Sequence, residues 1–158
     1  WLGVSTERQQ EADERIPLLL QTPAAKRFIS AEPLLGSIDL TNHDPHGTAH
    51  GWSSIWKNNG IGRAWLDWVI IGGESGPGAR PFNIEWARRI AGQCREAGVS
   101  CFIKQLGSKP FYETHDAKCT SQDTGRSIQL VPKDRKGGDL NEWPADLRVR
   151  EFPMAIER

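Results

Sequence analysis

Polar side chains that could do chemistry stand directly after short apolar segments of the chain. In parallel β/α architectures, ligands bind at the carboxyl ends of the strands, so such positions are the first candidates for a site. Acids and a base that converge on one rim can bind a polar ligand or shuttle protons. The ligand-binding candidates are Glu32, Glu74, Ser75, Lys104 and Gln105.

A purely structural role is the alternative for two of these residues. Glu32 and Lys104 could form an ion pair that closes the end of a barrel. A charged residue directly after a buried strand is costly to desolvate unless it has a partner or a task. This cost favours a ligand site, with the ion pair as the competing interpretation.

The loop from Gly72 to Gly78 holds four glycines in seven positions, which lets backbone N–H groups approach a ligand closely. Its spacing fits neither the dinucleotide-binding pattern nor the phosphate loop. The segment 73–77 also departs, at its last residue, from the Gly-x-Ser-x-Gly turn of serine hydrolases. The loop is therefore either a ligand cradle or a tight turn.

Three histidines, His43, His46 and His50, lie within eight positions. Imidazoles on a loop can capture zinc or nickel, but no cysteine or carboxylate stands at a recognised offset from them. We expect a solvated loop here and no metal site, with these histidines as the only metal candidates.

The cysteines Cys94, Cys101 and Cys119 are odd in number and widely spaced, which favours free thiols in a reducing compartment. No apolar run approaches the roughly 18 to 20 residues that span a bilayer, and no basic-then-apolar leader opens the chain. We therefore expect a cytoplasmic protein without a membrane partner.

The chain has 158 residues, of which 37% are hydrophobic, so it is long enough for one domain with a real core. The 20 Lys and Arg residues balance 20 Asp and Glu residues. This balance removes the simple electrostatic argument for a nucleic-acid or membrane partner, although a local basic patch is still allowed.

Four short apolar segments predict strands, and their alternation with helical patterns predicts a parallel sheet with helices outside. The clearest helix spans 84–97, with Asn83 as its N-cap and Gly98 after its end. A weaker helix spans 12–21, because Pro17 would interrupt a continuous ladder. The predicted strands are 1–5, 28–31, 68–71 and 101–103.

We therefore expect an α/β fold, a partial, half TIM-type β/α barrel with about four parallel strands. A complete barrel needs about 200 to 250 residues, so this chain supplies one half. The β/α units occupy 1–106, with a long loop at 41–62. An irregular C-terminal extension, 107–158, packs on the same domain. The chain opens at Trp1 within an expected strand, which suggests a fragment or a processed chain.

Several stretches resemble a family of bacteriophage and prophage proteins of largely unknown function whose members look like radical S-adenosylmethionine enzymes. The most specific is the block Gly72 to Pro81, with the sequence GGESGPGARP. The resemblance covers most of the chain outside 41–62. The stretches that carry it are 1–5, 12–19, 31–36, 69–81, 102–105, 134–139 and 142–144.

This resemblance implies a partial barrel whose N-terminal half carries three close cysteines for a 4Fe-4S cluster that cleaves S-adenosylmethionine. The cysteines of this chain lack that spacing, so we expect the chain alone to hold neither cofactor and not to be a competent enzyme. It would retain cofactor- and substrate-binding residues at the strand ends. A non-catalytic binding or interaction module is the alternative. The expected partner is the missing N-terminal half-barrel or a second copy at the open sheet edge, and nucleic acid is one candidate substrate.

Overall fold

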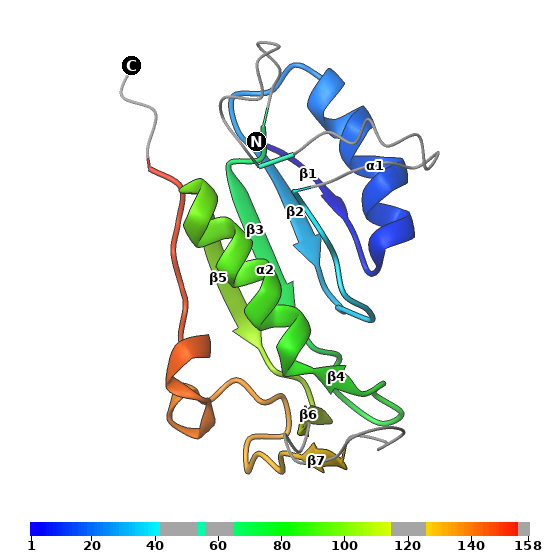
Figure 1. Cartoon of the computed structure of the whole chain (residues 1–158), viewed down its shortest axis with the longest axis vertical. Helices are drawn as coiled ribbons and strands as arrows, with labels where there is room; N and C mark the ends of the chain where they lie inside the picture. Colours follow the sequence, from blue (N-terminus) through cyan, green and yellow to red (C-terminus); the bar gives the residue numbers. More distant parts are fainter. Residues whose placement is uncertain (42–53, 56–64, 115–125, 155–158) are drawn as a thin grey trace, which may run out of the picture.

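The computed structural model describes residues 1–41, 54–55, 65–114 and 126–154 (Figure 1). In chain order, its helices and strands are β1 (Leu2–Ser5), α1 (Gln9–Gln21), β2 (Arg27–Ala31), β3 (Trp68–Gly72), β4 (Phe82–Asn83), α2 (Ile84–Ala97), β5 (Ser100–Gln105), β6 (Pro110–Thr114) and β7 (Arg126–Gln129). Two short 3₁₀ turns follow, η1 (Leu140–Glu142) and η2 (Ala145–Leu147).

The larger sheet has four parallel strands in the order β1-β2-β3-β5, which is also their order along the chain. Each new strand is added on the same side, and right-handed crossovers then place both helices on one face of the sheet. Ile29, Val69 and Cys101 lie side by side on that face and are buried. The predicted α/β fold with a parallel four-stranded sheet is confirmed.

Helix α2 begins and ends where its sequence predicts. The Asn83 side chain accepts a hydrogen bond from the Glu85 N–H at 3.0 Å, and Gly98 ends the helix with φ 67° in the left-handed region. Its buried residues Ala87, Ile90 and Cys94 face the sheet core. Both capping residues and the apolar stripe are local signals, which explains the agreement.

Helix α1 differs from the prediction because it starts three residues earlier and continues through Pro17. A proline inside a helix removes one backbone hydrogen bond and crowds the preceding turn. Here the buried stripe of Ala12, Ile16 and Leu19 packs into the core on both sides of that position. Burial of this stripe offsets the local cost, since tertiary packing supplies most helical stability in proteins.

The region after residue 107 is more regular than predicted. Strand β6 pairs antiparallel with β7 and parallel with β4, which forms a second, three-stranded sheet at the carboxyl end of the larger one (Figure 1). The pairing of β4 with β6 joins segments that are far apart in sequence, so short-range patterns could not reveal it. Neither described helix is long and apolar enough to cross a membrane.

The two edges of the larger sheet differ in whether a described segment pairs with them. Along β5, the C-terminal tail runs antiparallel: the Ile103 N–H donates to the Val149 carbonyl and the Glu151 N–H donates to the Cys101 carbonyl, both at 2.8 Å. Along β1, no strand within the described ranges pairs with the outer edge. Among the strands that the structure describes, β1 is therefore the edge without a partner on its outer side.

We predict that backbone amides on this edge exchange quickly with solvent deuterium. Leu2 and Thr6 donate their N–H groups to carbonyls of Lys26 and Ser30 on the β2 side, so the alternate N–H groups of Gly3 and Ser5 face outward. Hydrogen-exchange NMR should show Gly3 and Ser5 exchanging much faster than Ile70, which lies in β3 between two paired strands. Equal protection of all three amides would mean that β1 has a covered edge.

Candidate functional site

Glu32 and Lys104 meet at the carboxyl ends of β2 and β5. The Lys104 Nζ lies 3.0 Å from Oε1 and 3.2 Å from Oε2 of Glu32. The lysine side chain is 55% exposed and that of the glutamate 20% exposed, so the pair is open to solvent from one side. The structure therefore brings together two of the predicted site residues, one acid and one base.

The absence of a side chain at Gly72 permits this contact. Strand β3 lies between β2 and β5, so Glu32 must cross it to reach Lys104. A Cβ atom on Gly72 would stand only 3.0 Å from both Cγ and Cδ of Glu32. The glycine thus leaves the space that the carboxylate side chain occupies.

A β-bulge directs Lys104. Ile71 pairs with Ile103, but the next residue of β3, Gly72, pairs with Gln105, so Lys104 is an extra residue in β5. Bulges interrupt the ladder, bend the strand and re-aim a side chain, and they occur often next to functional sites. The sequence carries no local signal for this bulge.

Glu74 does not join this pair, although it was predicted on the same rim. Its carboxylate binds Arg80 instead, with Oε2 at 2.7 Å from Nε and Oε1 at 3.1 Å from Nη2. The Arg80 N–H also donates to Oε2 at 3.0 Å. These bonds lower the pKa of Glu74 to about 2. Ser75, the next residue, is exposed.

Gln105 holds the glycine loop in place. Its Nε2 donates to the Gly73 carbonyl at 2.9 Å, and its own carbonyl accepts the Gly73 N–H at 2.9 Å. Both polar groups of Gly73 are thus bound to one residue of the neighbouring strand. Gln105 remains a ligand candidate by position, while its amide nitrogen is engaged with the protein.

Three glycines from separate segments bring their backbones into close contact behind this loop. A Cβ on Gly73 would stand 2.3 Å from the Leu106 carbonyl oxygen. A Cβ on Gly107 would stand 2.5 Å from the Glu74 carbonyl oxygen, and one on Gly137 would stand 2.4 Å from the Gly107 carbonyl oxygen. The missing side chains at Gly73, Gly107 and Gly137 therefore make room for other backbone segments of the same protein.

The segment 134–139 contains Gly137, the third of these closely packed glycines. Asp134 accepts the Lys136 and Gly138 N–H groups at 3.1 and 2.7 Å, which shapes the turn. The buried Trp143 donates its Nε1 hydrogen to the Gly137 carbonyl at 2.9 Å. The motif residues of 134–144 thus position the loop that follows β3.

The sheet face opposite the helices carries a row of aromatic rings near the strand starts. Trp68 contacts Trp1, Phe28, Phe102 and Phe152, with ring centroids 5.4 to 6.0 Å apart. Trp1 and Phe152 remain about two-thirds exposed to solvent, at 66% and 64%. Apart from the tail, no described element covers this face.

Towards the carboxyl ends, the same face has small residues. Gly3, Ser5, Ser30 and Gly72 alternate with the core-facing positions of their strands. The Phe28 ring fills the space above Gly3, whose Cβ would stand 2.4 Å from that ring. The face thus carries aromatic rings at one end and small residues on β1, β2 and β3 at the other.

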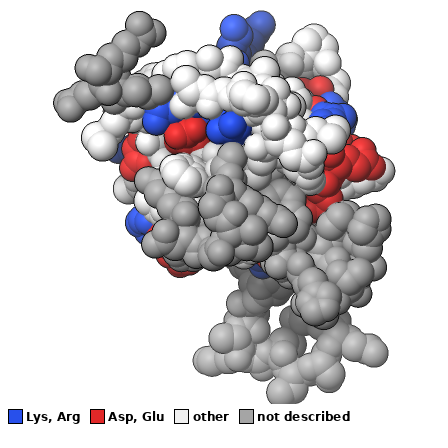
Figure 2. Space-filling model, turned by 90° about the horizontal axis from the view of Figure 1, so that it is seen from above, with Lys and Arg blue, Asp and Glu red and all other residues white. Residues whose placement is uncertain are grey.

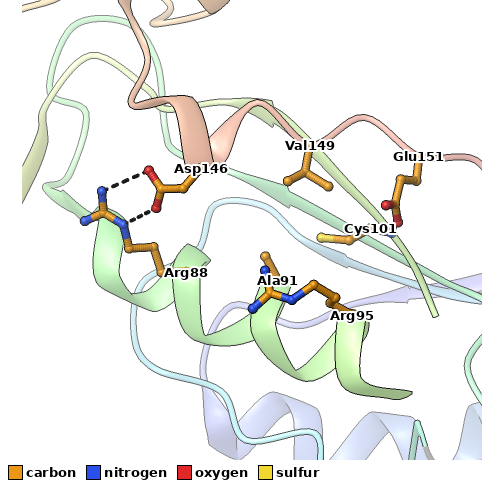
Figure 3. A pocket seen from close by; sticks show the side chains of 7 residues that line it. All are labelled: Arg88, Ala91, Arg95, Cys101, Asp146, Val149 and Glu151. Carbon is orange, nitrogen blue, oxygen red and sulfur yellow. Dashed lines mark hydrogen bonds and ion pairs between the residues drawn. The ribbon is translucent and has the colours of Figure 1, made fainter. Parts of the chain in front are cut away.

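A separate cavity of about 290 Å³ lies between α2, β5 and the C-terminal tail (Figure 3). Arg88 and Asp146 join across one end, with Nε and Oδ2 2.6 Å apart, and this bond lowers the pKa of Asp146. Sequence reasoning missed the cavity because three distant segments build it. Its lining residues are Arg88, Ala91, Arg95, Cys101, Asp146, Val149 and Glu151.

Metal ligands do not gather in the described parts of the chain. Cys94 and Cys101 are free and buried, and no group of three or more His, Cys, Asp or Glu residues is placed there to hold an ion. The predicted loop candidates His43, His46 and His50, like Cys119, lie outside the described residues.

Residues 1–135 match the family described as "Protein of unknown function (DUF5131)". The chain belongs to this family. The DUF5131 match includes the Glu32–Lys104 pair and the glycine loop, and it ends within the turn that precedes Gly137. No curated protein and no solved structure gives a significant match.

Replacing Gly73 by alanine should lower the free energy of unfolding by about 1 to 3 kcal/mol, because its Cβ would overlap a backbone carbonyl that cannot move freely. Gly92→Ala is the matched control: in α2 its Cβ would meet nothing within 4 Å, and alanine should stabilise the helix by about 0.5 to 1 kcal/mol. Urea denaturation measures both. A Gly73→Ala variant as stable as wild type would contradict the close backbone contact.

The Glu74 carboxyl should titrate with a pKa of about 2, below its ordinary value of 4.5, since Arg80 stabilises the charged form. A depressed folded-state pKa means that the pairing contributes fully above pH 4.5 and is lost as the pH falls towards 2. Carboxyl ¹³C NMR measures this midpoint. In Arg80→Gln the midpoint should rise towards 4.5; an unchanged midpoint would assign the shift to another cause.

Proposed function

We propose that this chain is the C-terminal part of a radical S-adenosylmethionine-like phage or prophage protein and contributes ligand-binding residues at its strand ends. The observation that carries the proposal is the Glu32–Lys104 pair, which lies at the carboxyl ends of two parallel strands on the face without helices. Strand ends of parallel β/α architectures are where ligands bind.

The strand order supports a half TIM-type barrel. In doubly wound sheets the strand order reverses and helices cover both faces, whereas in a β/α barrel consecutive strands follow one another and the helices form an outer ring. The order β1-β2-β3-β5, with both helices packed on one face, fits the second arrangement. The face with Glu32 and Lys104 would then be part of the inner wall.

The charge pair suits the amino-acid end of S-adenosylmethionine. A carboxylate of the ligand would bind Lys104, and its ammonium group would bind Glu32, so both side chains would exchange one charged partner for another. Ser5 and Ser30 are small residues on the same face of the sheet, towards the strand ends. Neither Glu32 nor Lys104 would then be left without a counter-charge, so the exchange of partners would cost little free energy.

The described cysteines do not fit a 4Fe-4S cluster. Cys94 and Cys101 are buried on the helix-covered side, at 0% and 1% exposure, away from the face that carries the charge pair. Such a cluster needs several thiolates converging on one site. We therefore propose that an N-terminal half of the barrel, and not Cys94 or Cys101, binds the cluster.

The partner of the open face is, in this proposal, the N-terminal half-barrel, with a second copy of the chain as the alternative. All-parallel sheets occur almost only with both faces covered. Exposed Trp1 and Phe152 and the unpaired edge of β1 mark where such a partner would attach. Figure 2 shows acidic and basic side chains side by side at the end of the molecule where the strands start, which is opposite the end that carries Glu32 and Lys104.

A non-catalytic binding or interaction module is the second proposal. It is favoured by the exposed aromatic face and by the close contact of Glu32 with Lys104, which fits a closing ion pair as well. The two proposals differ in what Lys104 does. In the first it binds a ligand, and in the second it contributes to stability alone.

Lys104→Ala should weaken binding of S-adenosylmethionine by about 1 to 3 kcal/mol while changing the free energy of unfolding by less than about 1 kcal/mol, because a solvent-exposed pair stabilises little. Isothermal calorimetry and thermal unfolding measure the two effects. Lys109→Ala, an exposed lysine beyond the strand end, is the control and should change neither.

Two results would contradict the ligand role. The first is a wild-type chain that does not bind S-adenosylmethionine. The second is a Lys104→Ala variant that loses stability while binding stays unchanged, which would support the closing ion pair.

A further inference from the structure

The C-terminal tail reaches the candidate site from outside the family match, which ends at residue 135. Its residues 149–151 run antiparallel to β5, with Arg150 directly opposite Phe102. Strand pairing, a Trp68 Nε1 bond to the Glu151 carbonyl at 2.9 Å, and a Phe152 ring contact with Phe102 fasten the tail. The tail is therefore an integral part of this sheet edge.

Arg150 connects the tail to the bulge that directs Lys104. Its Nη2 donates to the Lys104 carbonyl oxygen at 3.2 Å. That carbonyl belongs to the extra residue of β5, which the register shift takes out of the regular pairing with β3. A bulge leaves its extra residue unpaired in the ladder, so a donor from elsewhere can stabilise it.

The guanidinium of Arg150 is itself held in place. Its central carbon lies 5.5 Å from the Phe102 ring centre and 5.6 Å from the Trp143 ring centre. Trp143 is buried and bound to Gly137, so one of these rings belongs to the glycine-packed turn. Cation–π contacts on two rings limit the positions that this side chain can take.

We propose that Arg150 is a positioning residue for Lys104, which it holds in the bulged conformation that points the amine at Glu32. The ligand part of this inference rests on the proposed function, whereas the effect on Lys104 itself does not. A supporting residue of this kind acts through the geometry of the residue that touches the ligand.

The test compares Arg150→Gln, Arg150→Lys and the control Arg148→Gln. Arg148 lies in the same tail, but its side chain bonds only to carbonyls of Trp143 and Asn141 among the described residues. The Lys104 signal is followed in ¹H–¹³C spectra of protein labelled at lysine Cε, and is assigned by its loss in Lys104→Ala. Titration with S-adenosylmethionine is measured in parallel.

In Arg150→Gln we expect the Lys104 signal to shift and S-adenosylmethionine binding to weaken about tenfold, which corresponds to loss of one hydrogen bond from a charged donor. Arg150→Lys, which keeps a cationic donor, should recover part of both effects, and Arg148→Gln should change neither. Urea denaturation checks that each variant is folded.

An unchanged Lys104 signal in a folded Arg150→Gln variant would overturn the inference, and a shifted signal with unaltered binding would overturn its ligand part. Failure of the wild-type chain to bind S-adenosylmethionine would instead refute the proposed function. The Lys104 signal would still decide whether Arg150 positions that residue.

Discussion

The consecutive order of the four parallel strands is the constraint on which the rest of this structure depends. Because every strand is added on the same side, right-handed crossovers place α1 and α2 on one face and leave the other without helices. Because all four strands are also parallel, their carboxyl ends meet at one rim. The rings at the strand starts and the charge pair at the strand ends share the face without helices, because alternate side chains of a strand point to the same face.

Glycine determines how closely the parts of the rim approach one another. At Gly72 the missing side chain lets Glu32 cross β3, and at Gly73 and Gly107 it lets two loops touch through their backbones. A larger residue at Gly73 or Gly107 would press on the loop that carries Glu74 and Arg80, and one at Gly72 would press on the Glu32 side chain. The glycine-rich block thus serves the packing of the site.

The rim also depends on residues far along the chain. Gly137 and Trp143 support the loop after β3, and the tail lines the edge of β5. Together they close the side of the sheet next to β5, whereas no described strand covers the outer edge of β1. In the proposed half-barrel, further strands would therefore be added at β1, and the barrel would stay open at β5.

Local features of the sequence determined a good part of this structure. The helix at 84–97 follows from an N-cap, an apolar stripe and a C-terminal glycine, all within one short segment. The apolar segments before Glu32 and Lys104 predicted strands, and the parallel architecture then predicted that these two residues meet. They do, at 3.0 Å. These inferences work because caps, periodicity and strand polarity act over a few residues or follow from one topological rule.

Tertiary structure alone decided the other features. Glu74 stands after a strand as Glu32 does, yet Arg80 binds it, because the turn between them folds back on itself. The bulge at Lys104, the helix that continues through Pro17 and the second sheet all depend on contacts between distant segments. Their energies come from packing and register, which no single segment encodes, so the sequence by itself could not reveal them.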